Sequence, residues 1–455
     1  MNESGRRRLT GVPGYRNIRS YFGPIQHQGM KNNEAPNGRR VEPIILEAPG
    51  HPITRTHIDP DALKIIDRLD RQGFMACLVG GAVRDLMLGK TPKDFDIATD
   101  ARPGQIKKRF PNAYVIGRRF RLVHVHFPGG KIIEVATFRK DPRSIPAAPE
   151  DVILDSPADI YGTPREDAFR RDITINALLY DAVLDAVIDY VGGLEDLSRR
   201  RIRVIGDPVE RFTEDPVRIW RVLRHAARLG FEVEPCAAAA IRSQAHLLGT
   251  ASGARLYEEF NKELASETRP VGEALRSHGL LRVILGRAGE EYESDDNRFS
   301  RLCGLLEIED RARKAGVVIS HEEMYALIFW PWIEPLLLRD GRFDLHKTLH
   351  DQFQDLGAGA TIPKLVKANV IQMLYIAGTM IQALRTGHMR WALQRRTHYD
   401  PAGRLYFLIV KGRLPEPGET FEAEFKQAFP MGARPKRGGK RPPRIGFRGR
   451  PKSGP

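Results

Sequence analysis

The chain has 455 residues, of which 41% are hydrophobic and 28% charged, and a net charge of +15 at pH 7. Such a length suits about three domains with buried cores, and the positive charge indicates an anionic partner, most commonly nucleic acid. A membrane surface is the alternative, but we find no apolar run of transmembrane length and no apolar segment of a secretory signal after the basic N-terminus.

Residues 1–50 begin the chain as a polar segment rich in Gly, Asn and Arg, for which we expect a disordered basic arm. An extension without a role is the alternative. A helix is then predicted from Pro60, with Asp59 as its cap and Gly73 at its end. One face of this helix carries the apolar residues Ala62, Ile65, Ile66 and Leu69.

The stretch from Leu78 to Thr99 contains the first candidate site. An apolar run of strand length leads to Gly80 and Gly81, where backbone can approach a ligand closely, and a short helix with Arg84 near its start follows. The N–H groups of a helix start and a guanidinium group are both suited to phosphates.

Asp94 and Asp96 follow this helix. Residues i and i+2 of a strand point to the same side, so the two carboxylates would repel each other unless a cation lies between them. Mg²⁺ prefers such oxygen ligands and bridges carboxylates to substrate phosphates. A solvated turn explains an acidic pair on its own, but the combination with the two glycines and Arg84 predicts a metal–nucleotide site.

Three strands are predicted after Thr99. A short helix precedes them, and the predicted ranges are 103–110 for the helix and 114–117, 121–127 and 131–138 for the strands. Glu134 lies among apolar neighbours in the third strand, where a carboxylate needs a partner. If this strand lies beside that of Asp96, Glu134 completes a three-carboxylate site. A salt-bridged glutamate on an edge strand is the alternative.

Two later segments are rich in arginine. Residues 166–180 contain the candidates Arg171, Asp172 and Asn176, for which a surface helix with charge pairs is the alternative. A helix predicted from Pro216 has an apolar stripe of Ile219, Leu223 and Ala226. Its opposite face carries arginines at steps of three and four, without an acid to relieve their repulsion. These arginines are Arg218, Arg221, Arg224 and Arg228.

The motifs occur in a recognisable order along the chain. GGAVRDLMLG with DFD, IIEVATFR, RRD with INAL, and EDPVR resemble the motifs of the bacterial poly(A) polymerase and CCA-adding enzyme family of nucleotidyltransferases. The resemblance covers residues 53–231. It implies an α+β fold, in which a polymerase-beta-like head with a mixed sheet and helices precedes an all-helical neck and body, with disordered basic termini.

The resemblance also implies roles for individual residues. Asp94, Asp96 and Glu134 would be catalytic and hold two Mg²⁺ ions, with Mn²⁺ as the alternative metal. Asp215 and Arg218 would read the edge of the incoming base, although Asp215 alone is equally well explained as a helix cap. The implied nucleotide-binding residues are Gly80, Gly81, Arg84, Arg171, Asp172, Asn176, Asp215, Arg218, Arg221 and Arg224.

The expected function follows from the resemblance. The segment GRRFRLVHVHF at residues 117–127 resembles the poly(A) polymerases of the family. We therefore expect template-independent addition of AMP from ATP to RNA 3′ ends. One alternative is a CCA-adding tRNA nucleotidyltransferase, and the other is a catalytically inactive RNA-binding relative.

The expected domains and partners complete this interpretation. The domains are an arm at 1–50, a catalytic head at 51–193, a neck for nucleobase and RNA binding at 194–262, an RNA-binding body at 263–430 and a disordered basic tail at 431–455. The partners are ATP and RNA 3′ ends, with no membrane.

The tail has nine basic and no acidic residues, which suits phosphate backbones and makes it a candidate contact for RNA-degradation machinery. Three widely spaced cysteines form no disulfide or zinc pattern, so we expect the reducing environment of the cytoplasm. We also expect a monomer.

Overall fold

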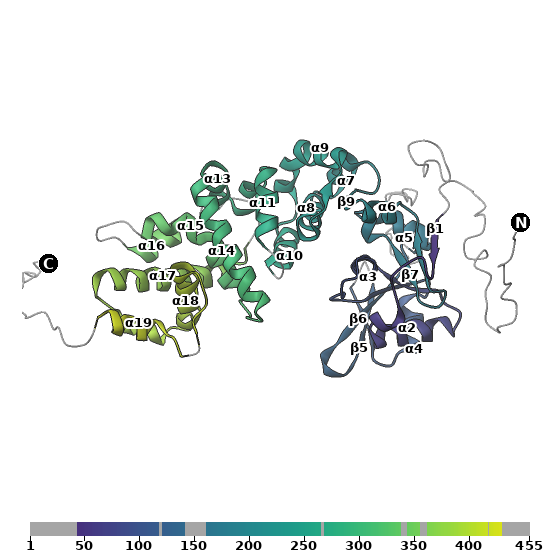
Figure 1. The fold of residues 1–455 in the computed structure, drawn as a ribbon, viewed down its shortest axis with the longest axis horizontal. Coiled ribbons are helices and arrows are strands. Elements are labelled where there is room, and N and C mark those ends of the chain that lie inside the picture. The colour runs from purple at the N-terminus through teal and green to yellow at the C-terminus, as the bar shows by residue number, and fades with distance from the viewer. Residues whose placement is uncertain are drawn as a thin grey trace, which may run out of the picture. The chain divides into compact units, whose positions relative to one another are not determined.

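The computed structural model describes most of the chain between residues 43 and 429. The described ranges are 43–117, 121–141, 161–264, 268–337, 344–354, 362–416 and 418–429. The predicted basic tail lies outside them, as does all but the end of the predicted arm. The described residues form two compact units, one ending at Glu293 and the other beginning at Ser294 (Figure 1).

The first unit contains an eight-stranded mixed sheet with the order β1-β8-β7-β2-β3-β6-β5-β4. Its strands are β1 (Ile44–Glu47), β2 (Ala76–Val79), β3 (Asp96–Thr99), β4 (Ala113–Ile116), β5 (Leu122–His126), β6 (Ile132–Thr137), β7 (Leu179–Asp181) and β8 (Ala186–Asp189). β1 lies within the range expected to be a disordered arm, and it pairs antiparallel with β8. β3 and β6 run parallel, while the other described neighbours run antiparallel.

α2 (Pro60–Asp70) shows how local sequence sets an element of this unit. The Asp59 side chain accepts hydrogen bonds from the N–H groups of Asp61 and Ala62, as the predicted cap requires. The four predicted apolar side chains of the helix are fully buried. α2 contacts β2 and β3, and α4 (Pro103–Arg109) contacts β4 and β5.

The two faces of the sheet are covered differently. On the face toward α2 and α4, Ile97 of β3, Val135 of β6 and Val123 of β5 are cross-strand neighbours, and all three are fully buried. The opposite face is buried over β2, β7 and β8, where Val79 and Ile188 join a cluster with Ala168 of α5 (Pro164–Arg170). Over β4, β5 and β6 this second face carries exposed side chains.

The remaining elements of the first unit are mostly helices. The helices are α3 (Gly81–Met87), α6 (Gly193–Ser198), α7 (Pro208–Glu214), α8 (Val217–Leu229), α9 (Pro235–Gln244), α10 (Gly253–Leu264), α11 (Arg269–Ser277), α12 (Leu281–Leu285) and α13 (Arg287–Ser294). A parallel pair of short strands consists of β9 (Arg201–Ile202) and β10 (Glu232–Val233). Short helical turns lie at Arg55–His57, Pro128–Gly130, Thr174–Asn176 and Ala245–Thr250. The predicted apolar stripe of α8 is buried. Pro216 is the N-cap of α8 rather than its first residue, because α7 and an extended Asp215 immediately precede it.

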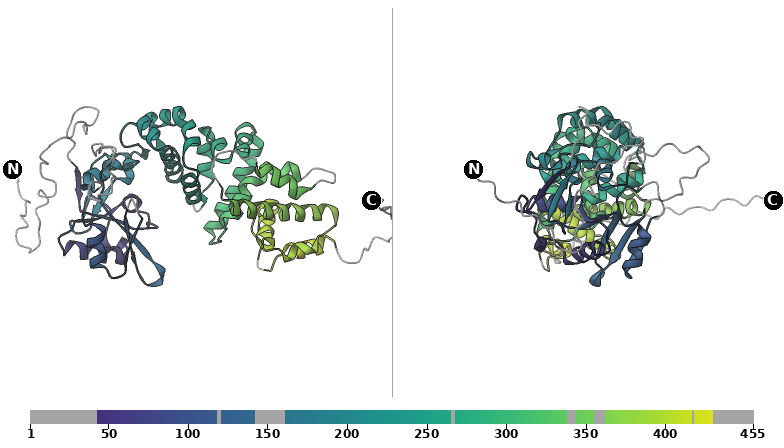
Figure 2. Two further views of the ribbon diagram at one scale, coloured as in Figure 1. Left: turned by 180° about the vertical axis from the view of Figure 1, so that it is seen from behind. Right: turned by 90° about the vertical axis from the view of Figure 1, so that its right-hand side faces the viewer.

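The described part of the second unit is helical. Its elements are α14 (Asp296–Lys314), α15 (His321–Leu337), α16 (Leu345–Gln354), α17 (Lys364–Thr386), α18 (Tyr399–Tyr406) and α19 (Phe421–Ala428), with helical turns at Trp391–Arg395 and Phe407–Lys411. α17 packs against α15, α16 and α18, and the left view of Figure 2 shows this group of helices, coloured green to yellow, from behind. Among the described helices, none combines the length and apolar character that a membrane span requires. The mixed sheet and the helical remainder confirm the predicted fold class.

Candidate active site

Two of the predicted carboxylates are neighbours in the sheet. β3 and β6 pair in parallel, with Ile97 opposite Val135, so the residues one position earlier, Asp96 and Glu134, lie next to each other on one face. This is the arrangement in which Glu134 could complete a carboxylate site. β6 lies between β3 and β5, so the alternative of an edge-strand glutamate is wrong.

Asp94 lies outside the strand. β3 begins at Asp96, so strand alternation does not place the two aspartates together as expected. Asp94 is nevertheless close enough to influence Asp96 electrostatically. Burial, then the charges of Glu134 and Asp94, raise the pKa of the Asp96 carboxyl to about 6, although the side chain keeps access to solvent.

The three carboxylates are chemically suited to a metal ion, but they do not form a preorganised metal site. Within the described ranges, no group of three His, Cys, Asp or Glu side chains is arranged to hold an ion as it stands. The Glu134 carboxylate lies 3.7 Å from His124 Nε2. The donor set of two aspartates and a glutamate suits Mg²⁺, and the repulsion that raises the pKa of Asp96 is what a bound cation relieves.

The glycine turn lies beside these carboxylates. Val79, at the end of β2, pairs with Asp96, and Gly80 follows it with φ 73° and ψ −139°, a conformation that favours glycine. A Cβ on Gly80 would lie 3.5 Å from Arg171 Nη1, and one on Gly81 would lie 3.3 Å from Arg84 Nη2. Guanidinium groups from two separate motifs therefore flank the turn.

Arg84 is buried and anchored within the protein. Its Nε and Nη2 donate to Asp85, and its Nη1 donates to Asn176 Oδ1 at 2.7 Å. The structure thus brings together two predicted residues from distant motifs. The Arg84–Asn176 hydrogen bond joins these two motifs on one side of the glycine turn.

Asp167 organises the RRD segment and was not predicted. One of its oxygens accepts from Arg170 and the other from Arg171, and Oδ1 also accepts from the Arg139 N–H. Burial would raise the pKa of Asp167, but Arg171 and Arg170 together hold it below its ordinary value. The signal was present in the sequence, since an acid three and four residues before two arginines is a helical pairing pattern.

Asp172 and His225 form a second buried group. Asp172 Oδ2 lies 3.1 Å from Arg221 Nε. Burial opposes ionisation, but the charge of Arg221 lowers the pKa of Asp172 to about 2. Burial and Arg224 lower the pKa of His225 well below its ordinary value, so this histidine is neutral at pH 7 and adds no charge to the arginine row.

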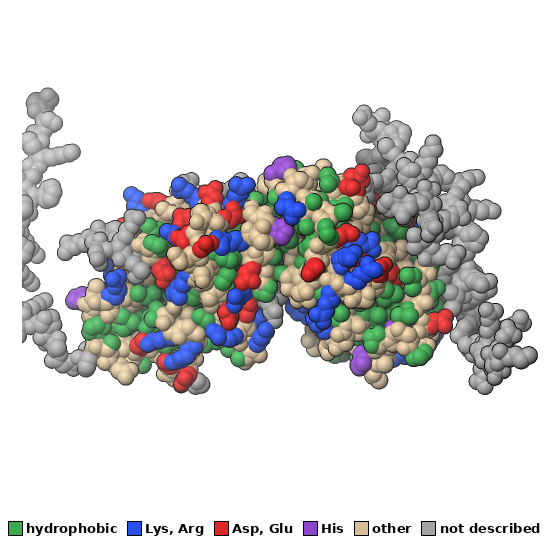
Figure 3. All heavy atoms as spheres, turned by 45° about the horizontal axis from the view of Figure 1, so that its top comes forward, with side chains coloured by type: hydrophobic (Ala, Val, Ile, Leu, Met, Phe, Trp, Pro, Cys, Tyr) green, Lys and Arg blue, Asp and Glu red, His purple; other side chains and the backbone are tan. Residues whose placement is uncertain are grey.

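The expected repulsion along α8 is wrong for three of its arginines, because acids arrive from other elements. Arg218 pairs with Glu214, Arg221 with Asp172, and Arg224 with Glu259. Arg224 is also buried, so this face of α8 is not simply solvated. Basic and acidic side chains are likewise intermixed on the face drawn in Figure 3.

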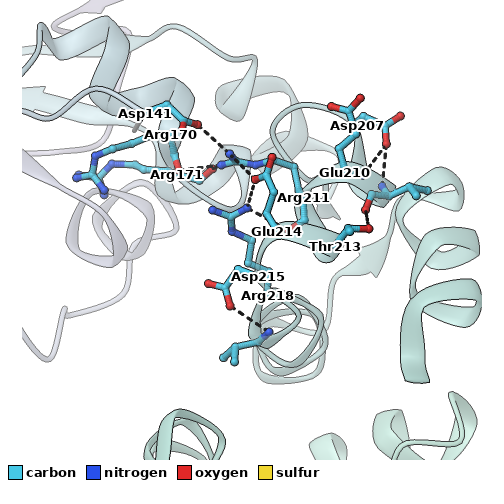
Figure 4. A network of polar contacts seen from close by, with 12 residues as sticks. Asp141, Arg170, Arg171, Asp207, Glu210, Arg211, Thr213, Glu214, Asp215 and Arg218 are labelled. Atoms are coloured by element: carbon cyan, nitrogen blue, oxygen red, sulfur yellow. Dashed lines mark hydrogen bonds and ion pairs between the residues drawn. The ribbon is translucent and has the colours of Figure 1, made fainter. Parts of the chain in front are cut away.

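Asp215 and Arg218 lie side by side at the junction of α7 and α8 (Figure 4). Asp215 accepts from the Val217 N–H at 3.3 Å, which is a cap-like contact, and it also receives two hydrogen bonds from Arg255 of α10, at 2.9 and 2.8 Å. Arg218 Nη1 donates to Glu214 and to the Arg211 carbonyl, both at 3.0 Å. Arg255 was not predicted.

Arg211 is a further residue that the sequence did not reveal. Its guanidinium is buried, donates to Asp141, and donates to the carbonyl oxygens of Arg170 and Arg171 at 2.8 Å each (Figure 4). It therefore ties α7 to the backbone of the RRD segment. Carbonyl acceptors leave no trace in the side-chain pattern, so no sequence signal could have identified this link.

Known proteins are similar to this chain in sequence. Residues 76–203 match the family described as the poly(A) polymerase head domain, and residues 230–288 match the probable RNA and SrmB-binding site of polymerase A. Poly(A) polymerase I of Salmonella typhimurium is 40% identical over 301 residues, which are 64% of this chain and 64% of that protein. The CCA-adding enzyme of Bacillus licheniformis is 37% identical over 231 residues, or 50% of this chain and 56% of that enzyme.

Solved structures agree with this similarity. The Bacillus stearothermophilus CCA-adding enzyme, crystallised with CTP, has a TM-score of 0.57 and 28% identity over 82% of this chain and 83% of that chain. The chain spans less than two thirds of the length of the first curated relatives, at 64% of the Salmonella protein. The matched domains, the order of the motifs and the shared fold lead to one conclusion: residues 76–203 match a poly(A) polymerase head domain, and the chain resembles the poly(A) polymerase and CCA-adding enzyme family of nucleotidyltransferases.

Proposed function

We propose that this protein adds AMP from ATP to RNA 3′ ends without a template. The observation that carries the proposal is a glycine turn, flanked by two guanidinium groups, next to acidic residues on adjacent strands. The turn at Gly80 and Gly81 suits a triphosphate. Asp96 and Glu134, with Asp94 before them, suit the divalent ions that phosphoryl transfer uses.

The protein's own residues would position and neutralise the reacting groups. Asp94, Asp96 and Glu134 would hold two Mg²⁺ ions, which supply charge neutralisation and make the RNA 3′-hydroxyl a better nucleophile. The 3′ oxygen forms a bond to the α-phosphorus as the bond to pyrophosphate breaks. Backbone at the glycine turn, with Arg171 beside it, would orient the triphosphate, so catalysis is mainly positioning and charge stabilisation.

We further propose that Asp215 and Arg218 select the base. The Arg218 N–H donates to the Asp215 carbonyl at 3.0 Å, which fixes the spacing of the two residues. A carboxylate acceptor beside a rigid donor fork can match the hydrogen-bonding edge of a purine. Asp172, Asn176, Arg221 and Arg224 would support this position through their buried contacts.

AMP addition is favoured over CCA addition by the sequence comparisons. The Salmonella poly(A) polymerase I aligns over 64% of this chain at 40% identity, whereas the Bacillus licheniformis CCA-adding enzyme aligns over 50% at 37%. We also propose the head at 51–193, neck at 194–262 and body at 263–430 as functional divisions of the chain, acting as a monomer in the cytoplasm. Contact of the basic tail with RNA-degradation machinery belongs to the same proposal.

The test uses the full chain with Mg²⁺ and two RNAs, a generic single strand and a tRNA without its 3′ end. Each RNA is incubated with ATP, with CTP and with both, and products are sized on a sequencing gel. A long ATP-dependent ladder on the generic RNA is expected. Addition of a few nucleotides to the tRNA alone, with a requirement for CTP, would instead identify CCA addition.

The variants Asp94→Ala and Asp96→Ala test the assignment of the carboxylates. Both are expected to lose AMP transfer while they retain RNA in a filter-binding assay. Glu47→Gln, an exposed acid on β1 of the same sheet, is the matched control and should remain active. Incorporation near the wild-type rate by both alanine variants would refute the carboxylate site. RNA retention without incorporation of any nucleotide by the wild type would indicate an inactive RNA-binding relative.

A further inference from the structure

The sheet face that carries Glu134 continues onto β5 and β4 with large exposed side chains. Tyr114 is 56% exposed, Ile132 48% and Ile116 45%. His124 and His126 lie between them on β5. Apolar side chains gathered on one exposed face usually mark an interaction surface. We refer to Tyr114, Ile116, His124, His126 and Ile132 as the β4–β5–β6 platform.

Strand register places this platform in line with the candidate active site. Tyr114 pairs with His124, and His124 pairs with Glu134. Glu134 lies beside Asp96, which pairs with Val79 just before the glycine turn. A single row of cross-strand neighbours therefore runs from the glycine turn, through the carboxylates, to the edge strand β4.

Side-chain contacts confirm that the row lies on one face. His124 Nε2 is 3.7 Å from a Glu134 carboxylate oxygen. The Tyr114 ring meets the His126 ring edge-on, with centroids 4.9 Å apart. The β5–β6 hairpin extends past the helices of the first unit in Figure 1 and, seen from behind, in Figure 2.

The other half of the same face is an ordinary core. Over β2, β7 and β8, Val79, Leu179 and Ile188 are buried in a cluster with Ala168 of α5. Burial of this face stops at the carboxylates, and exposed aromatic and aliphatic groups begin directly beyond them. The platform is therefore a distinct feature of the sheet rather than a continuation of its core.

We propose that the platform binds the last unpaired bases of the RNA whose 3′ end is extended. This inference rests on the proposed function. In phosphoryl transfer the attacking and leaving oxygens lie roughly in line across the phosphorus. If the leaving pyrophosphate lies at Gly80 and Gly81, the RNA 3′-hydroxyl approaches from the opposite side, past Glu134. β5 and β4 are the strands on that side.

The chemistry of the platform suits single-stranded RNA. Bases stack on aromatic and apolar side chains, and such stacking tolerates any sequence because every base has a π face. Adjacent strands are about 4.8 Å apart, so the row from Glu134 to Tyr114 has room for the terminal nucleotides. Exposed Arg121, just before β5, supplies positive charge for the RNA backbone, in a chain with a net charge of +15.

The first test measures steady-state kinetics with a short single-stranded RNA. Tyr114→Ala should raise the KM for RNA about tenfold, as expected for the loss of one base–aromatic contact, with kcat and the KM for ATP unchanged. Tyr114→Phe keeps the ring and should behave as the wild type. Ile44→Ala is the matched control, because Ile44 is 52% exposed on β1, at the opposite edge of the same sheet.

The second test does not depend on catalysis. The same RNA, labelled with fluorescein at its 5′ end, is titrated without ATP or metal and followed by anisotropy. RNA with 4-thiouridine near its 3′ end is also photocrosslinked to the protein, and adducts are expected on the peptides that contain Tyr114 and His126. Absence of AMP transfer by the wild type would refute the proposed function, while anisotropy and crosslinking would still decide the role of the platform.

Three results would overturn the inference. One is an unchanged KM and RNA affinity for Tyr114→Ala, with crosslinks only on other segments. Another is an equal loss for Ile44→Ala, which would indicate a general effect on the sheet. The third is a wild-type dimer that Tyr114→Ala converts to a monomer in sedimentation, which would make the face an interface between copies of this chain.

Discussion

At the scale of single residues, Asp96 illustrates the electrostatic cost of a carboxylate that lies close to two others. Its pKa is raised to about 6 by burial and by two neighbouring carboxylates. Because the folded state then binds a proton more tightly than the unfolded state, this residue makes the metal-free protein less stable as pH rises from about 4 to about 6. Above about pH 6, the loss of stability caused by Asp96 has reached its full size.

Asp96→Asn should therefore stabilise the metal-free protein. At pH 8 with EDTA, we expect its melting temperature to rise by about 1–2 °C, a small effect because solvent screens an exposed carboxylate. Mg²⁺ should raise the melting temperature of the wild type more than that of the variant. Differential scanning fluorimetry measures both effects, with Glu47→Gln as the control. A melting temperature of Asp96→Asn below that of the wild type in EDTA would contradict this account of repulsion.

At the scale of elements, His225 of α8 joins the helix to the motifs beside the sheet. Its Nε2 lies 3.3 Å from Asn176 Nδ2, and Asn176 in turn accepts from Arg84. The pKa of His225 is lowered well below its ordinary value by burial and by Arg224. Protonation therefore favours the unfolded state, and this contribution to stability is lost as pH falls below about 6.5.

His225→Gln removes the titrating group but keeps a hydrogen-bond acceptor. Between pH 6.5 and 5.5 the wild type should lose roughly 1 kcal/mol more stability than the variant. Urea denaturation at the two pH values measures this difference, and the opposite contribution of Asp96 cancels because both proteins contain it. Parallel losses in the two proteins would mean that His225 is protonated in the folded state.

The Asp215–Arg255 pair connects α10 to the residues that we propose select the base. Its two hydrogen bonds fix the direction of the Asp215 carboxylate. Arg255→Ala should therefore lower the preference for ATP over CTP, measured as a ratio of kcat/KM values, by about tenfold. Arg199→Ala is the control, because Arg199 forms an exposed pair with Glu195 on the same unit. An unchanged nucleotide preference would exclude a positioning role for Arg255.

How far the sequence predicted the fold and the site depended on whether a contact was local. The cap at Asp59, the turn at Gly80 and the strand predicted around Glu134 follow from neighbouring residues, and all were confirmed. The position of Glu134 beside Asp96 needed the sheet order, so it could be stated only conditionally. The partners of Arg211 and Arg255 lie on other elements, where periodicity carries no information.

The same dependence on non-local contacts explains why the predicted repulsion among the arginines of α8 was wrong. A helix considered alone has four arginines and no acid on one face. Glu214, Asp172 and Glu259 reach three of them from α7, the RRD segment and α10. Charge patterns within one element therefore predict repulsion correctly only when no other element packs against that face.

At the scale of the whole molecule, the net charge of +15 should dominate the salt dependence of RNA binding, and nine of the basic residues lie in residues 431–455. Each phosphate contact contributes about −0.7 to the slope of log K against log salt for single-stranded nucleic acid. Removal of residues 431–455 should make this slope shallower and weaken binding at 150 mM salt, while kcat at saturating RNA is retained. Anisotropy titrations across a series of salt concentrations measure the slope.

The matched control keeps the length of the tail and changes only its charge. A variant with all nine basic residues of the tail replaced by glutamine should behave like the truncated chain, since the counterion effect depends on charge and not on chain length. If both variants keep the wild-type slope and affinity, the tail does not contribute to RNA binding. A loss in the truncated chain alone would show that the tail acts through contacts other than those of its basic side chains.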